Sequence, residues 1–457
     1  MISVNQATVS GTCRSKRLPM RSAVSICVVL AGCTASSEEV RPPPDQMFFP
    51  TGAAVSPGDE RLLFVANANS ELRYDSGSIS VIDLNEVDRI ATQWTTSGLS
   101  ESGCEPDPDH RETLTCDEPM FMVPDAATRI GNFATDIAVQ DTGNGTLRLF
   151  VPTRGDPSIA WIDWDGSKLD CNPGAQGFAL CDEAHRLAYV HDDPDLALVP
   201  DEPFDAYADS TGQYAVVSHL TSGAVTLIDS PIGGDAIVAD VLSGLFAADQ
   251  SSGLRGATGI SARTPGGMIY VASRSENRIQ TLTVGRPQND ALPYLLAGNY
   301  FFLNVVGGAT GGSRDSRSLQ FSPSGDRLYL INRRPPSLQI FDTSLGPTGY
   351  PNNEGLAATD ICRQASTLAV VDTGDGERAY VTCFQDGQLY VIDPRGLSSV
   401  EDIIQVGRGP FSVVASAARK KVYVTNFLED TIAVIDVSPT SAYYNRVVLR
   451  IGEVKPL

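Results

Sequence analysis

The sequence predicts an all-β protein built from seven four-stranded antiparallel units that pack as blades in a ring. The repeated pattern is clearest at Lys421–Ser438, where two runs of β-branched and aromatic residues, Val422–Thr425 and Thr431–Ile435, flank a polar turn. The same pair of runs recurs six more times upstream. Both faces of the expected strands are apolar, which is typical of sheets that are covered on both sides.

Each unit is expected to contain strands A, B, C and D in chain order. A turn rich in Pro, Gly, Asp or Asn precedes nearly every strand B, because these residues readily adopt the dihedral angles of a tight connection. The seven strand B segments are Phe64–Asn67, Phe150–Thr153, Ala215–Ser218, Tyr270–Ser273, Tyr329–Asn332, Tyr380–Cys383 and Tyr423–Asn426. They lie farther apart in the first half of the chain, so we expect the early units to carry insertions, mainly the long loops 98–124 and 164–200.

The last three units resemble a known family of repeats. The sequence Val-Tyr-Val-Thr-Asn at 422–426, its variant Tyr380–Cys383 and the trailing Val-Ile-Asp are similar to the YVTN family of β-propeller repeats. The resemblance covers roughly residues 48–452 and is weakest in the second and third units. It implies a seven-bladed β-propeller over residues 48–457. It implies no particular activity, because this fold hosts many.

Residues 1–32 are interpreted as a targeting segment and not as part of the fold. Cations up to Arg21 precede the apolar stretch Ala23–Leu30. Leu30–Cys33 reads Leu-Ala-Gly-Cys and resembles the lipobox of a bacterial lipoprotein signal peptide at every position. The resemblance implies cleavage before Cys33 and a lipid on its sulfur. The alternative is an ordinary secretory signal with a Cys there by chance.

Residues 33–47 are expected to form the lipidated cysteine and a polar, proline-rich tether. Thr34 follows Cys33 where a retained lipoprotein would carry Asp, so we expect anchoring to the bacterial outer membrane. No other stretch approaches the ~20 apolar residues of a membrane span, so the lipid is the expected membrane contact.

Charge excludes one class of partner. The chain carries a formal net charge of −21. A surface that acidic repels phosphate backbones, so we expect no nucleic-acid partner, and we expect a monomer. Six cysteines remain after the targeting segment and Cys33, an even number that suits disulfides in an oxidising compartment. Local spacing favours the pairs Cys104–Cys116, Cys171–Cys181 and Cys362–Cys383. No Cys-x-x-Cys motif supports zinc or thiol redox chemistry.

Several arginines are candidates for a ligand site. Alignment of the units places Arg255, Arg314 and Arg408 at one position before strand A, with Arg363 within a residue of it and Arg129 close by. In a propeller the D–A and B–C connections share the face around the channel mouth. Guanidinium groups bind carboxylate or phosphate well, so these five predict an anion-binding mouth. The alternative is that each Arg pairs with an acid or a carbonyl of the neighbouring blade.

Other polar residues are expected to serve the fold. Asn67, Asn332 and Asn426 end strand B and should close the B–C turn through their own side chains. The acidic clusters Glu105–His110 and His191–Asp195 could hold Ca²⁺, but neither matches a defined calcium loop. We therefore predict no metal and no cofactor.

Sequence motifs for catalysis are absent. There is no Gly-x-Ser-x-Gly elbow, no Walker A loop and no dinucleotide fingerprint, and His219 is the one histidine expected near the mouth. The leading interpretation is a binding or interaction module for an anionic small ligand or a protein partner. Two alternatives stay open: a lactonase-like hydrolase, on fold analogy alone, and a passive scaffold of the cell envelope.

Overall fold

A computed structural model describes residues 40–454 except 156, 189–198, 251, 265–266, 289–290, 304–313 and 397. The targeting segment, Cys33 and the acidic cluster His191–Asp195 lie outside the described residues. No helix within these ranges is long and apolar enough to cross a membrane.

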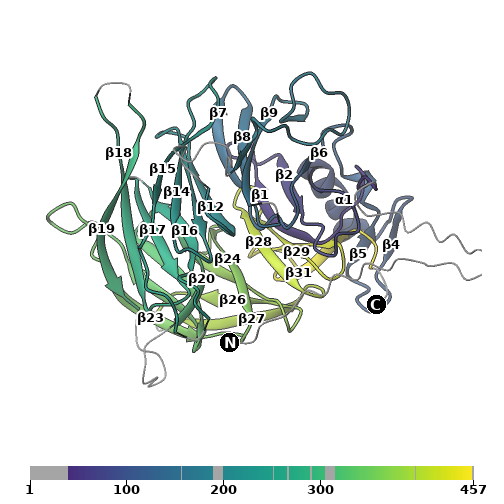
Figure 1. The fold of residues 1–457 in the computed structure, drawn as a ribbon. Coiled ribbons are helices and arrows are strands. Elements are labelled where there is room, and N and C mark those ends of the chain that lie inside the picture. The colour runs from purple at the N-terminus through teal and green to yellow at the C-terminus, as the bar shows by residue number, and fades with distance from the viewer. Residues whose placement is uncertain are drawn as a thin grey trace, which may run out of the picture. The chain divides into compact units, whose positions relative to one another are not determined.

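Seven antiparallel sheets surround a common centre, each built mainly from four strands that follow one another in the chain (Figure 1). From inner to outer strand, blade one consists of β1(Pro50–Val55), β2(Leu62–Asn67), β3(Gly77–Asp83) and β6(Thr128–Ile130). Blade two consists of β7(Ala138–Gly143), β8(Thr146–Thr153), β9(Ser158–Trp164) and β10(Leu169–Asp170), with β11(Arg186–Ala188) also paired to β9. Blade three consists of β12(Pro203–Asp209), β13(Tyr214–His219), β14(Val225–Asp229) and β15(Ile237–Leu242). Blades four and five are β16(Ala257–Arg263), β17(Met268–Ser273), β18(Arg278–Gly285), β19(Tyr294–Phe302); and β20(Arg314–Phe321), β21(Arg327–Arg334), β22(Pro336–Asp342), β23(Glu354–Asp360). Blades six and seven are β24(Ala365–Asp372), β25(Glu377–Cys383), β26(Gln388–Asp393), β27(Ser399–Gln405); and β28(Pro410–Ser416), β29(Lys421–Asn426), β30(Thr431–Asp436), β31(Arg446–Ile451). The predicted seven-bladed β-propeller is confirmed.

The core lies between adjacent blades. Every residue of β2 is buried, and the strand B tyrosines Tyr270, Tyr329, Tyr380 and Tyr423 are all less than 2 % exposed. Apolar side chains of one blade pack on those of the next, so both faces of each sheet are covered. Burial of this kind supplies the main favourable free energy of folding.

The ring closes without exchange of a strand between its two ends. Blade seven consists of consecutive C-terminal strands, and its inner strand β28 packs on β1. Thr425 Oγ1 donates to Thr51 O at 2.8 Å across this junction, and Thr51 Oγ1 donates to Ala134 O of blade two at 2.8 Å. Such side-chain hydrogen bonds join neighbouring blades to one another.

The insertion of blade one contains regular structure, both before and within the loop expected at 98–124. After β3, Asp83 caps the helix α1(Leu84–Ser97), whose residues Leu84, Val87, Ile90 and Ala91 are buried. The strands β4(Cys104–Pro106) and β5(Leu114–Cys116) then form a hairpin, and the short 3-10 helix η2(Glu118–Met120) leads toward β6. β5 pairs in parallel with β31, so an insertion of blade one covers the outer edge of blade seven (Figure 1). An edge covered in this way cannot pair with another chain.

The three disulfides predicted from local spacing are all present. Cys104–Cys116 bridges β4 and β5, Cys171–Cys181 lies in the insertion of blade two, and Cys362–Cys383 joins the start of blade six to the end of its strand B. The expectation that the sixth hairpin brings Cys362 and Cys383 together is confirmed.

Candidate functional site

In blades one, five and seven, an asparagine at or near the end of strand B fastens the turn that follows. Asn67 Nδ2 donates to Ser78 Oγ at 3.0 Å, Asn426 Nδ2 to Thr431 Oγ1 at 3.1 Å and Asn332 Nδ2 to Pro335 O at 3.1 Å. The structural role expected for these three asparagines is confirmed.

His219 takes the same position in blade three. Pro203 pairs with His219 as Pro50 pairs with Asn67, so the strand B segment of blade three begins one residue later than the sequence alignment placed it. His219 Nε2 lies 2.8 Å from Thr226 Oγ1, and burial lowers the pKa of His219 to about 4. A neutral, fully buried imidazole fastens the turn and is not a base at the mouth.

The next residue opens the B–C connection and differs sharply between blades. It is Ala68, Arg154, Leu220, Arg274, Arg333, Phe384 and Phe427 in blades one to seven. Arg154, Arg333 and Phe384 line a cavity of about 360 Å³ at the inner ends of the blades. A concave site of this size at the centre of a scaffold is the usual place for a small ligand.

The remaining walls of this central cavity come from the inner strands and the D–A connections. Asp136 and Asp205 contribute carboxyl groups, Arg317 a third guanidinium, and Phe204 and Phe411 two aromatic rings. Each of these side chains is only partly buried. The cavity therefore combines cations, carboxyl groups and aromatic surface within reach of solvent.

A cluster of guanidinium groups shares one carboxylate beside the cavity. Asp315 Oδ1 lies 3.1 Å from Arg317 Nε and 3.3 Å from Arg274 Nε, and Asp315 Oδ2 lies 3.6 Å from Arg334 Nε. Arg333 donates to the carbonyl of Ala365 at 2.6 Å. Burial lowers the pKa of Arg317 to about 9, with Arg333 contributing to that shift, and burial also lowers the pKa of Arg333. Positive charge is in excess at this wall.

Arg154 approaches from blade two and is matched by an acid. Its guanidinium hydrogen-bonds Glu202, which also accepts from Thr221 Oγ1. Burial alone would raise the pKa of Glu202, but the hydrogen bonds from Thr221 and Arg154 outweigh it and lower that pKa. Glu202 is therefore charged at neutral pH and orients Arg154.

Asp136 and Asp205 form a carboxyl pair between blades two and three. Asp136 Oδ2 accepts from Ala206 N at 3.0 Å, and Asp205 Oδ2 accepts from Ile260 N at 2.9 Å. Burial raises the pKa of Asp205 well above its ordinary value, and the neighbouring Asp136 raises it further. The pair therefore retains a proton to higher pH than an isolated carboxyl would.

This pair predicts a pH-dependent stability. The pKa of Asp205 is higher in the folded than in the unfolded chain, so its contribution is fully present below about pH 4 and is lost as pH rises through the folded-state pKa. Asp205→Asn keeps an oxygen acceptor and removes the titration. We expect its free energy of unfolding to exceed that of the wild type increasingly with pH, by about 1.4 kcal/mol per unit between the two pKa values. Urea unfolding of both proteins from pH 5 to pH 8 measures this, and a constant difference would contradict the shared proton.

The five arginines predicted from the sequence do not line the central cavity. Arg255, Arg314, Arg363 and Arg408 do share one position, since each lies two residues before equivalent inner-strand residues, namely Ala257, Ser316, Ala365 and Pro410. Their side chains lie outside the central cavity. Arg255 Nη1 donates to Phe246 O at 3.3 Å, Arg408 Nε donates to Glu429 Oε1 at 3.1 Å, and Arg314 and Arg363 are exposed.

Arg129 was placed incorrectly by the alignment. It lies on β6, the outer strand of blade one, where Nη1 donates to Asp75 Oδ2 at 2.8 Å and Nε to Phe178 O at 3.2 Å. Ala134 pairs with Thr153 at the end of strand B, so the position equivalent to the other four arginines is Asn132, and Arg129 lies three residues before it. The alternative, pairing with an acid or a carbonyl of the neighbouring blade, describes Arg129, which donates to Phe178 O in the insertion of blade two. Arg255 and Arg408 bond instead within their own connection or blade.

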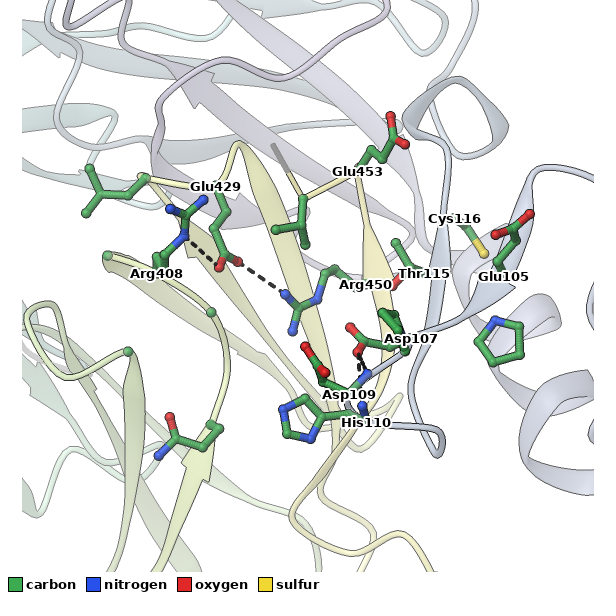
Figure 2. A pocket seen from close by; sticks show the side chains of 18 of the residues that line it. Glu105, Asp107, Asp109, His110, Thr115, Cys116, Arg408, Glu429, Arg450 and Glu453 are labelled. Carbon is green, nitrogen blue, oxygen red and sulfur yellow. Dashed lines mark hydrogen bonds and ion pairs between the residues drawn. The ribbon is translucent and has the colours of Figure 1, made fainter. Parts of the chain in front are cut away.

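A second and larger cleft, of about 1570 Å³, lies over blade seven beside the β4–β5 hairpin. Gln364 and Phe384 line both this peripheral groove and the central cavity, so the two adjoin. Figure 2 shows Glu429 between Arg408 and Arg450, with Arg450 Nη1 donating to Glu429 Oε2 at 3.2 Å.

The acidic cluster Glu105–His110 forms part of this peripheral groove, with Asp107, Asp109 and His110 near Arg450 (Figure 2). Asp107 Oδ1 accepts from the amides of Asp109 and His110 at 2.9 and 3.0 Å, so it caps its own turn. Within the described part of the chain, no three metal-ligating side chains come together.

Comparisons with known proteins identify the fold but do not assign the chain to a family. No family model matches the chain, and no curated protein matches it. Among solved structures it is similar to Kuenenia stuttgartiensis hydrazine synthase (TM-score 0.54, 11% identity, 89% of this chain and 98% of that one). It is also similar to a putative 6-phosphogluconolactonase from Bacteroides uniformis (0.51, 12%, 79% and 87%) and to the Cps50 (Swd1) β-propeller domain of Myceliophteria thermophila (0.52, 11%, 86% and 98%). Likeness at such identity concerns the fold alone.

Proposed function

We propose that the protein is a lipid-anchored binding module of the bacterial cell envelope that holds a small organic anion in its central cavity. The observation that carries the proposal is the cluster of Arg274, Arg317, Arg333 and Arg334 around the single carboxylate of Asp315. The cluster stands out because the whole chain carries a net charge of −21.

A bound anion would relieve the cost of holding these cations together. Arg317 and Arg333 line the cavity, and each has a pKa lowered by burial beside other guanidinium groups. Charge-assisted hydrogen bonds are strongest where water is partly excluded, and guanidinium groups can engage a carboxylate or phosphate through two donors at once. Arg154 enters the cavity from blade two and could contact the far side of the same ligand.

Two observations support the envelope location. The Leu-Ala-Gly-Cys sequence ending at Cys33 has the form of a lipidation signal. Three disulfides join the six remaining cysteines, and such bonds persist in oxidising compartments.

A second candidate is hydrolysis of an anionic lactone in the same cavity. Asp205, whose pKa is raised by burial, would supply a proton as a general acid beside the carboxyl group of Asp136. The fold similarity to the putative 6-phosphogluconolactonase agrees with this candidate but does not carry it.

Calorimetric titration of the full-length protein with small carboxylates and phosphate tests the binding proposal. We expect Arg333→Met to weaken binding about tenfold or more, because it removes one charge-assisted contact. Arg395→Met is the matched control, since Arg395 is an exposed partner of Asp393 on blade six and should leave binding unchanged. Failure of every anion to bind would overturn the proposal. Lactone hydrolysis that Asp136→Asn abolishes would instead assign the enzyme.

A further inference from the structure

The mouth of the propeller has two chemically different halves. The residue that opens the B–C connection is Arg in blades two, four and five, and Phe in blades six and seven. The arginines are Arg154, Arg274 and Arg333, and the aromatic residues are Phe384 and Phe427. Blades six and seven place no cation at this position, so the mouth is not a uniform ring of charge.

Aromatic side chains form a continuous patch on the second half. The ring centroid of Phe427 lies 6.0 Å from that of Phe384, 6.1 Å from that of Phe411 and 5.4 Å from that of Phe49. Phe384 and Phe411 line the central cavity and are only partly buried. Partly exposed aromatic surface in a concave site gains free energy when an apolar group covers it.

A third phenylalanine lines the cavity from the opposite wall. Phe204 of blade three also lines the cavity. In a closed ring of seven blades, the position opposite blade three falls between blades six and seven, so Phe204 faces Phe384 and Phe411 across the cavity. By the same geometry, the position opposite Arg154 of blade two falls between blades five and six, and blade five supplies Arg317 and Arg333.

We infer that the ligand is an aromatic carboxylate, with its ring between Phe204 and the phenylalanines of blades six and seven and its acid group on the arginines. This inference rests on the proposed function, since it names the class of anion held in the same cavity. A cavity of about 360 Å³ suits one substituted ring and its acid group. Inorganic phosphate or acetate would leave the aromatic side in contact with water.

The test is a titration of the full-length protein with benzoate, acetate, inorganic phosphate and benzyl alcohol. We expect benzoate to bind about tenfold or more tightly than acetate or phosphate, because only benzoate contacts both halves of the mouth. Benzyl alcohol carries the ring without the charge and should bind more weakly than benzoate.

Two substitutions separate the contributions of the two halves. Phe384→Leu and Phe411→Leu keep an apolar side chain and remove the ring, so each should weaken benzoate severalfold and leave acetate unchanged. If either variant unfolds early, Phe204→Leu carries the same test from the opposite wall. Phe302→Leu, on the outer strand of blade four, is 61% exposed and serves as the matched control.

The outcomes distinguish this inference from the proposed function. Equal affinity for benzoate and acetate, with both lost in Arg333→Met, would overturn the aromatic class and retain the anion site. Benzoate affinity that none of the three Phe→Leu variants alters would also overturn it. If none of the anions binds, both the inference and the proposed function fail.

Discussion

The Asp315→Asn variant is expected to have a free energy of unfolding about 2–4 kcal/mol below that of the wild type. Asp315 is buried, with 6% of its surface exposed, and lies within salt-bridge distance of Arg274, Arg317 and Arg334. Arg317 is the most buried of the three, so most of the loss comes from leaving its charge without a partner. Arg334 is largely exposed and should contribute little.

The change from Asp315 to Asn removes the negative charge and leaves the backbone conformation undisturbed. Asp315 has φ of 61°, a conformation that Asn tolerates as well as Asp. Asp125 has φ of 56° and is exposed, so Asp125→Asn makes the same chemical change on the same kind of backbone and should alter stability by less than about 0.5 kcal/mol.

Urea unfolding measures both variants, with and without sulfate. Sulfate should restore part of the stability of Asp315→Asn, because an anion that binds the folded state takes over the role of the missing carboxylate. An Asp315→Asn protein as stable as the wild type would show that the guanidinium cluster does not need its counter-charge, and it would remove the basis for an anion site.

The fold could be predicted because the repeats are local. Each strand B carries apolar residues on both faces, and each is followed by a second run at short range, so the pattern survives in single blades such as 422–436. The disulfide pairs could be predicted for the same reason, because the two cysteines of each pair lie close together in the sequence. The helix α1 was missed although its signal is present, since Asp83 precedes Leu84 and further apolar residues recur at helical spacing.

The type of candidate site could be predicted from the sequence, but not the residues that form it. The sequence predicts an arginine-rich mouth built from the residues before strand A, whereas the arginines that line the central cavity are Arg154, Arg317 and Arg333. Two of the three directly follow an aligned strand B, so comparison of that position between units could have found them. The role of Asp315 depends on packing between blades four and five, which no repeat within the sequence encodes.

Removal of the blade six disulfide should have the second large effect. The bond Cys362–Cys383 closes a segment with a sequence separation of 21, and its loss in a Cys362→Ala, Cys383→Ala double variant should lower the free energy of unfolding by about 3 kcal/mol. Cys383 ends strand B, the position where Asn67 and Asn426 fasten the turn in their own blades. Blade six therefore loses the covalent link between the start of the blade and the end of its strand B.

The same bond also positions the mouth. Gln364 and Phe384 line the central cavity, and each lies within two residues of a cysteine of this pair. We therefore expect the double variant to bind benzoate more weakly as well as to unfold earlier. The control is Cys171→Ala with Cys181→Ala, a disulfide pair with a sequence separation of 10 in the insertion of blade two. That control should lose stability and keep its affinity, because no residue within two positions of either cysteine lines the cavity. Equal affinity in both double variants would mean that the inner strand and the B–C turn hold Phe384 in place without the disulfide.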